Sequence, residues 1–195
     1  MRIAAATNNK NKIAEIQHIL ASNGQCNIEI VSPKSLNILS NPDEDSDTLE
    51  GNARIKAVSL FKKASIASFA DDTGLFVEEL NGEPGVHSAR FASEEASDEE
   101  NRKLLLKLLE GKSNRKAYFE TVICFISESE EQYFKGQCHG QIKTVETGEN
   151  GFGYDSIFIP DGYYETFAEL NPAIKNRISH RYNAVTRFTD WLKSK

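Results

Sequence analysis

Two adjacent carboxylates, Asp71 and Asp72, follow the apolar run that begins at Ser68, and a Thr-Gly pair comes directly after them. A second apolar run starts at Leu75, so the pattern predicts a bend between two half-buried segments. Because successive strand side chains point to opposite faces, the two carboxylates are expected to face different surroundings. We predict that Asp71 bonds backbone amides in a turn and that Asp72, with Thr73 beside it, is free for chemistry. The alternative is an Asx-type turn without further meaning.

The first predicted strand, from Arg2 to Ala6, leads through a polar turn into an amphipathic helix. The free N–H groups and the dipole at the start of that helix favour an anion above the strand. The turn lacks the glycines of a Walker A loop, and the alternative is an ordinary capped helix start. The candidate anion-binding residues are Thr7, Asn8, Asn9, Lys10, Asn11 and Lys12.

An acidic segment holds four carboxylates within the five positions from Asp43 to Asp47. It leads into a helix that is predicted to begin near Thr48 and to return to the strand with the paired carboxylates. If the acidic segment and the acidic strand meet, they offer the hard oxygen ligands that Mg²⁺ prefers when phosphates supply the rest. The alternative is a solvated loop.

A glycine-rich stretch at residues 148–155 combines three glycines, two aromatic residues and Asp155, just before a predicted strand at residues 156–159. Glycines let a backbone approach a ligand closely, and an aromatic side chain on such a loop offers a face to a flat ring. The alternative is a loop whose aromatic side chains fill the core.

The last predicted helix, from about Ala173 to Leu192, is amphipathic and packs its apolar stripe on the core. Lys175 and Arg181 lie off that stripe and His180 lies at its margin, which by itself indicates ordinary surface polarity. The predicted stripe consists of Ile174, Ile178, Tyr182, Val185, Phe188 and Leu192.

The other segments predict a second strand from Asn27 to Val31, a helix from Ser97 to Leu109, and two long strands, Lys116 to Ile126 and Gln132 to Val145, joined by a hairpin. No repeat, low-complexity tract or linker divides the chain, so residues 1–195 are expected to form a single α/β domain. The leucines expected to face inward from the helix are Leu104, Leu105, Leu108 and Leu109.

Composition excludes several classes of protein. The formal net charge of −6 argues against a main role in binding nucleic acid. No apolar run approaches the ~20 residues that span a bilayer, and the N-terminus resembles a strand more than a signal peptide. Cys26, Cys124 and Cys138 are odd in number and widely spaced, which fits reduced thiols in the cytoplasm.

Six motifs follow one another at residues 7–12, 49–53, 70–75, 84–90, 151–155 and 178–181. Together, and in this order, they make the chain resemble the inosine triphosphate pyrophosphatase family, whose members act on noncanonical purine nucleoside triphosphates. The resemblance covers essentially the whole length. Three positions depart from the family pattern: Ser156 replaces a usual proline, His87 a common tyrosine, and Ser46 a usual glycine after the acidic pair.

The resemblance implies an elongated mixed β-sheet flanked by helices, in two lobes with a central cleft, and a homodimer. It also implies Mg²⁺-dependent hydrolysis of ITP, dITP and XTP to the monophosphate and pyrophosphate. Water attack on the α-phosphorus needs a base and a metal. Asp72 suits the base and also a metal ligand, and Glu44 is the preferred second ligand, with Glu50 or Asp43 as alternatives.

The substrate imposes further demands. Its triphosphate needs cations, for which Lys10, Lys12 and Lys175 are candidates. Arg181 has only N–H donors, so it satisfies the 6-oxo group of hypoxanthine or xanthine but not the amino group of adenine. An unpaired polar group in a closed pocket costs about 1–3 kcal/mol. Phe152 is expected to stack on the base. The other residues expected to bind substrate are Thr73, Gly153, Tyr154, Asp155 and His180.

Other functions stay open at this point. A related enzyme that hydrolyses other modified or standard nucleoside triphosphates would share these residues. A nucleotide sensor would keep the pocket and lose the chemistry. How the base site refuses guanine does not follow from the sequence.

Overall fold

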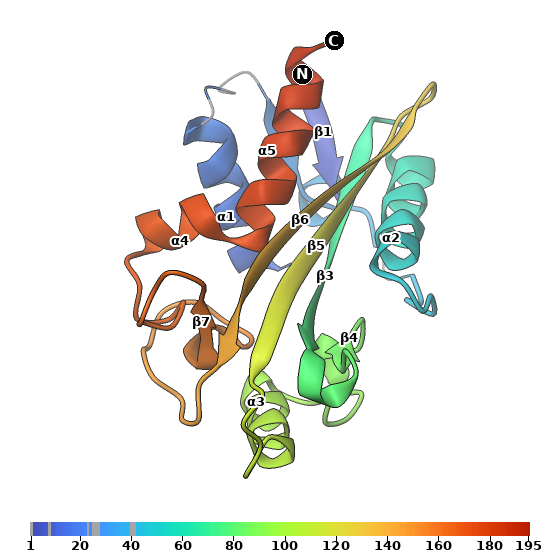
Figure 1. The fold of residues 1–195 in the computed structure, drawn as a ribbon. Coiled ribbons are helices and arrows are strands. Elements are labelled where there is room, and N and C mark those ends of the chain that lie inside the picture. Colours follow the sequence, from blue (N-terminus) through green and yellow to red (C-terminus); the bar gives the residue numbers. More distant parts are fainter. Residues whose placement is uncertain (1, 8, 23, 25–27, 40–41) are drawn as a thin grey trace. The chain divides into compact units, whose positions relative to one another are not determined.

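The computed structural model describes residues 2–7, 9–22, 24, 28–39 and 42–195. The fold is mixed α/β, with one mixed sheet flanked by helices (Figure 1). Hydrogen-bonded strands follow the order β2-β1-β3-β5-β6-β7, and β4 pairs with β3. The strands are β1 (Arg2–Ala5), β2 (Glu29–Val31), β3 (Ser68–Val77), β4 (Pro84–Gly85), β5 (Lys116–Ile126), β6 (Glu131–Ile142) and β7 (Phe158–Pro160). The helices are α1 (Lys10–Ser22), α2 (Leu49–Ala64), α3 (Asp98–Leu108), α4 (Pro172–Ile178) and α5 (His180–Lys193).

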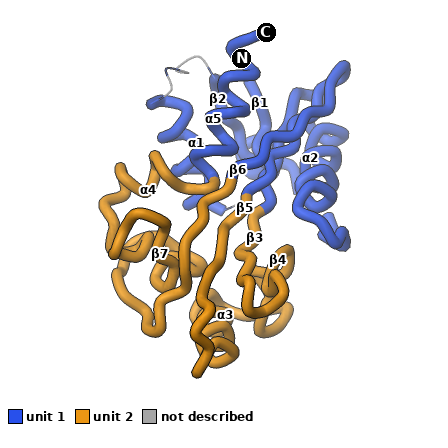
Figure 2. The backbone as a smooth tube through the Cα atoms, viewed as in Figure 1, with its two compact units in different colours: residues 1–72, 121–136, 181–195 blue, residues 73–120, 137–180 orange. Residues whose placement is uncertain are grey.

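The chain forms two compact units (Figure 2). Unit 1 comprises residues 1–72, 121–136 and 181–195, and unit 2 comprises residues 73–120 and 137–180. The two-lobed arrangement with a central cleft, and the single domain over residues 1–195, stay predictions. None of the described helices is both long and apolar enough to cross a membrane.

In unit 1, β1 pairs in parallel with β2 on one side and β3 on the other. Parallel neighbours need a crossover connection, which α1 and α2 supply. The alternation of β1 side chains divides the helices between two faces (Figure 1). Ile3 packs in a cluster with residues of α1 and α5, such as Ile19 and Phe188, whereas Ala4 packs with Leu60 of α2.

In unit 2, β4 runs antiparallel to β3 and β7 runs antiparallel to β6. Helix α3 starts with the predicted cap: the Ser97 side chain accepts a hydrogen bond from the Glu100 backbone, and the Glu100 side chain accepts one from Ser97. This reciprocal cap satisfies backbone donors that the helix leaves free. Leu105 faces the core, but Leu108 is 41% exposed, so the prediction that it points inward is wrong.

The predicted bend at the paired carboxylates is wrong, because β3 continues from Ser68 to Val77 without interruption. Gly74 is needed for close packing and not for a turn. A Cβ atom there would lie 2.5 Å from the carbonyl oxygen of Gly85 on the neighbouring strand. β5 has the predicted bounds, and β6 ends at Ile142, three residues earlier than expected.

The predicted final helix is two helices, because Ser179 adopts an extended backbone (φ −68°, ψ 156°) between α4 and α5. Serine favours this conformation directly before a helix more than a place inside one. Ile174 is 40% exposed and so lies off the buried stripe. The strand expected at residues 156–159 begins only at Phe158, after a 3₁₀ turn over Asp155–Ile157.

Candidate functional site

The polar turn before α1 is shaped by its own side chains. Asn9 Oδ1 accepts hydrogen bonds from the backbone N–H groups of Asn11 (3.0 Å) and Lys12 (3.2 Å), so Asn9 caps the helix. Thr7 Oγ1 accepts one from the N–H of Asn9 at 3.1 Å. Lys10 and Asn11 are exposed. Asn8 lies outside the described residues.

Asp71 is fully buried and joins α1 to α5. There is no turn at this place, and the described partners of its carboxylate are side chains: Lys12 Nζ lies 3.0 Å and Arg181 Nη2 lies 3.5 Å from Asp71 Oδ2. Arg181 also binds Glu15 of α1. Burial alone would raise the pKa of Asp71, but the charges of Lys12 and Arg181 outweigh it and hold that pKa well below its usual range. Asp71 is therefore a carboxylate at neutral pH.

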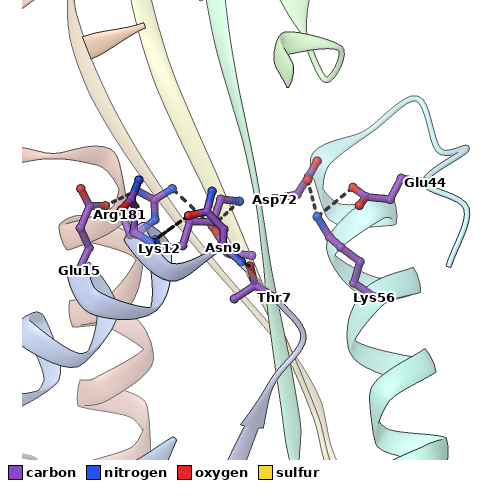
Figure 3. A network of polar contacts seen from close by, with 10 residues as sticks. Thr7, Asn9, Lys12, Glu15, Glu44, Lys56, Asp72 and Arg181 are labelled. Carbon is purple, nitrogen blue, oxygen red and sulfur yellow. Dashed lines mark hydrogen bonds and ion pairs between the residues drawn. The ribbon is translucent and has the colours of Figure 1, made fainter. Parts of the chain in front are cut away.

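Asp72 belongs to a second cluster, shown in Figure 3. Lys56 Nζ of α2 donates hydrogen bonds to Asp72 Oδ1 at 2.6 Å and to Glu44 Oε2 at 2.9 Å. The side chains of Lys56 and Asp72 are only 12% and 11% exposed. Burial raises the pKa of Asp72, and Lys56 offsets part of that rise. Burial lowers the pKa of Lys56, but Asp72 and Glu44 outweigh it and raise that pKa, so Lys56 stays an ammonium ion.

The two clusters lie on opposite sides of β3. Lys12, Glu15 and Arg181 lie on one side of the strand, whereas Lys56 and Glu44 lie on the other (Figure 3). The prediction that the adjacent carboxylates face different surroundings is therefore confirmed, and it follows from strand alternation.

The second cluster suits a divalent cation. The carboxylates of Asp72 and Glu44 already converge on one positive group, the Lys56 ammonium, and hard oxygens are what Mg²⁺ prefers. Among the described residues, no three His, Cys, Asp or Glu side chains gather to hold a metal, so phosphates or water would have to complete the shell. Of the two reserve ligands, Glu50 binds Lys135 of β6 and Asp43 is exposed.

Lys56 and Glu15 are polar residues of the site that the sequence reasoning missed. The sequence does contain a pattern that marks Lys56. It follows Asn52 by four residues, so two polar side chains lie on one helix face beside an apolar stripe, and Asn52 is buried. Asn52 Oδ1 accepts a hydrogen bond from the N–H of Ser46 at 3.0 Å and so ties the acidic segment to α2. Gly51 permits this approach, because a Cβ atom there would lie 1.9 Å from Ser46 Oγ. Glu15 had no signal.

In unit 2, the glycine-rich stretch wraps around the buried carboxylate of Asp155. Asp155 Oδ2 accepts hydrogen bonds from the N–H of Phe152 (2.9 Å) and from Lys175 Nζ (2.7 Å). Lys175 Nζ also lies 5.2 Å from the centroid of the Phe152 ring. A Cβ atom on Gly151 would lie 2.1 Å from Asp155 Oδ2, so only glycine fits there. The structure therefore brings together Phe152, Asp155 and Lys175.

Three other predicted residues of unit 2 have separate surroundings. The buried His180 ring stacks on Phe119, with centroids 4.5 Å apart. Tyr154 is also buried, and its hydroxyl donates to the carbonyl oxygen of Ser88 at 2.8 Å. Thr73 lies half-buried in β3. Tyr154 thus anchors the stretch to the core of unit 2.

A model of the Ham1 family matches residues 3–191. The dITP/XTP pyrophosphatase of Flavobacterium johnsoniae is 47% identical over 192 residues, 98% of this chain and 98% of that protein. The dITP/XTP pyrophosphatase of Leptospira interrogans is 43% identical over 196 residues, 100% of this chain and 98% of that protein. The solved structure of a HAM1 protein from Coxiella burnetii has a TM-score of 0.91 and 34% identity over the whole of both chains. The resemblance indicated by the six motifs is confirmed, and the chain belongs to the Ham1 family.

Proposed function

We propose that this protein is a pyrophosphatase that converts dITP, XTP and ITP to the nucleoside monophosphate and pyrophosphate. Its relatives named dITP/XTP pyrophosphatase are 43–47% identical over nearly the whole chain. The observation that carries the proposal is the cluster of Asp72, Glu44 and Lys56, which combines a buried carboxylate with a second carboxylate on one cation.

Asp72 is the proposed general base. In the reaction a water oxygen bonds to the α-phosphorus, the bond from that phosphorus to the bridging oxygen breaks, and pyrophosphate leaves with the electron pair. The water proton passes to the Asp72 carboxylate. Burial raises the pKa of Asp72 above that of an ordinary carboxyl group, which makes its carboxylate a stronger base. The hydrogen bond from Lys56 fixes its orientation.

Asp72 and Glu44 are the proposed ligands of Mg²⁺. When bound, the ion supplies positive charge that stabilises the departing pyrophosphate. On the other side of β3, Lys12 is the proposed donor to phosphate oxygens, and the dipole of α1 favours negative charge at the same place. The charge of Lys12 also acts on Asp72. Lys12 is already aligned by Asp71.

The proposed base site consists of Phe152 with Asp155 and Lys175. An aromatic face held on a fixed loop suits stacking on a flat purine ring. Arg181, as a donor to the 6-oxo group, stays a prediction, since its described partners are Glu15 and Asp71.

The test is release of pyrophosphate from dITP, XTP and ITP by the purified protein with Mg²⁺. Pyrophosphate from these three, far slower release from dATP and dGTP, and loss of activity with a chelator are expected. Orthophosphate as the product would indicate a phosphatase. Tight binding without release would favour a nucleotide sensor. Equal rates on the standard nucleotides would favour the related, less selective enzyme.

A homodimer and a cytoplasmic location stay predictions. For the dimer, light scattering is expected to give twice the chain mass of 21.8 kDa, and a value of one chain mass would contradict it.

A further inference from the structure

We propose that Asp98 and Arg102 of α3 are positioning residues that hold the loop carrying Phe152 and so set how tightly the purine ring binds. This inference rests on the proposed function, in which Phe152 stacks on the base.

Both backbone polar groups of Gly153, the residue after Phe152, are bound by these side chains. The N–H of Gly153 donates to Asp98 Oδ2 at 2.7 Å, and its carbonyl oxygen accepts from Arg102 Nη1 at 2.8 Å. Hydrogen bonds with one charged partner are about twice as strong as neutral ones. Helix α3 thus binds both the N–H and the carbonyl group of Gly153.

The first turns of α3 position the two side chains that bind Gly153. Asp98 and Arg102 are four residues apart and so lie on one face of the helix. The Ser97–Glu100 cap fixes where the helix begins. The buried Asn101 fixes its rotation, since its side chain donates to the carbonyl oxygen of Ala89 at 3.0 Å and accepts from the N–H of Ala92 at 2.8 Å.

The guanidinium of Arg102 has little freedom of its own. Its side chain is 17% exposed, and its Nε donates to Glu146 Oε2 at 2.8 Å while Nη1 binds Gly153. Glu146 precedes the glycine-rich stretch by two residues. Arg102 therefore connects the segment just before that stretch to Gly153 within it.

The backbone of Gly153 is restrained by hydrogen bonds and not by packing around its α-carbon. Its φ of +60° is in the left-handed region, and no atom lies within 4 Å of where a Cβ would be, so packing does not restrict it and glycine has wide backbone freedom. Consecutive N–H groups are bound by different carboxylates, Phe152 by Asp155 and Gly153 by Asp98. Without Asp98 and Arg102, the ordering of the Phe152 ring would have to be completed when the substrate binds, which weakens binding.

The test compares Asp98→Ala and Arg102→Ala with the matched controls Glu99→Ala and Lys103→Ala. The control residues follow the test residues on the same helix, and their described ion pair is with each other. We expect KM for dITP and XTP to rise about 10-fold in each test variant with kcat within about 2-fold, because the lost stacking acts equally on ground and transition states. Both controls should keep the wild-type KM.

Two further measurements separate positioning from a general loss of structure. Inorganic triphosphate has no base, so its inhibition constant should be the same in all variants, whereas a damaged fold would raise it. In a Phe152→Ala background, Asp98→Ala should change KM less than about 2-fold, since residues acting through one contact are not additive. A full additional 10-fold effect in that background would overturn the proposal. Asp98→Asn keeps an acceptor for the Gly153 N–H and should fall between Asp98→Ala and wild type.

Calorimetry of dITP binding without divalent metal tests the positioning role separately from catalysis. If the wild type binds dITP but releases no pyrophosphate, the proposed function fails, and about 10-fold weaker binding by Asp98→Ala would still support the positioning role. If Asp98→Ala and Arg102→Ala bind as tightly as the two controls, the positioning role is wrong. If the wild type does not bind dITP, both proposals are wrong.

Discussion

The charges around the paired carboxylates are arranged differently. The Asp71 carboxylate is held by Lys12 and Arg181, and Arg181 also binds Glu15. On the other side of β3, the carboxylates of Asp72 and Glu44 converge on Lys56. Carboxylate oxygens that converge on one point are the ligands that Mg²⁺ prefers. The second cluster is therefore the one suited to bind a metal.

Asp72→Asn tests the general base. The substitution keeps the shape and removes the proton acceptor, so kcat should fall about 10²–10⁴-fold while the dissociation constant for dITP changes little. Steady-state release of pyrophosphate and calorimetry measure the two quantities. Asp190→Asn on the exposed face of α5, whose described ion pair is with Lys193, is the control. Normal turnover by Asp72→Asn would remove Asp72 from the mechanism.

Lys56→Met tests the buried cation. Asp72 and Glu44 would then repel each other, and the free energy of unfolding should fall by about 3 kcal/mol, at the low end for breaking a buried pair since Glu44 stays partly exposed. Mg²⁺ alone should restore part of this loss, because it binds only the folded cluster. Urea unfolding with and without Mg²⁺ measures both effects, with Lys62→Met on the same helix as control. Equal loss in both variants would contradict the role of Lys56.

At the scale of elements, backbone conformation decides which side chains meet. The glycine-rich stretch can wrap around Asp155 because Gly151 has no Cβ. Lys175, which binds Asp155, belongs to α4, and α4 ends before Ser179, so its direction is independent of α5. In one continuous helix, Ile174 would lie on the same buried face as the apolar residues of α5. The break at Ser179 explains why Ile174 is exposed instead.

Gly151→Ala and Gly162→Ala form a matched pair for this stretch. The φ angle is +80° at Gly151 and +84° at Gly162. An alanine at either position therefore adds about 1–3 kcal/mol of backbone strain. Only Gly151→Ala adds a clash with Asp155, because nothing lies within 4 Å of a Cβ at Gly162. We expect Gly151→Ala to be the less stable in urea and to have the higher KM for dITP. Equal KM values would show that the loop tolerates the methyl group.

At the scale of the whole molecule, the buried thiols link unfolding to pH. Burial raises the pKa of Cys124 and of Cys138 to about 12 each, against about 8.5 for an exposed thiol. A raised folded pKa means that this contribution to stability is complete below about pH 8.5 and is lost as the pH rises towards 12, since the unfolded chain releases its thiol protons first.

The free energy of unfolding should therefore fall above about pH 9, by up to about 1.4 kcal/mol per pH unit for each thiol. Urea unfolding at pH 8 and at pH 10.5 under reducing conditions measures this slope. The double variant Cys124→Ala, Cys138→Ala should start less stable but lose less on going to the higher pH. The same loss in variant and wild type would assign the alkaline effect to other groups.

The sequence alone determined the features that depend on neighbours along the chain. The cap of α3, the bounds of β5 and the opposed directions of Asp71 and Asp72 follow from local hydrogen bonding, propensity and strand alternation. The order of six motifs was enough to indicate the family.

Only the tertiary structure decided which charges are buried and with whom. Lys175 and Arg181 look like surface residues in a helical pattern, but each is nearly inaccessible and bound to a carboxylate. Arg181 meets Glu15 across 166 residues, and Lys56 meets Asp72 across 16. A charge can be buried only where a partner offsets its lost hydration. Such partners come from segments that folding alone brings together. A local pattern can therefore mark a residue such as Lys56 as unusual, but it does not identify the residue's partner.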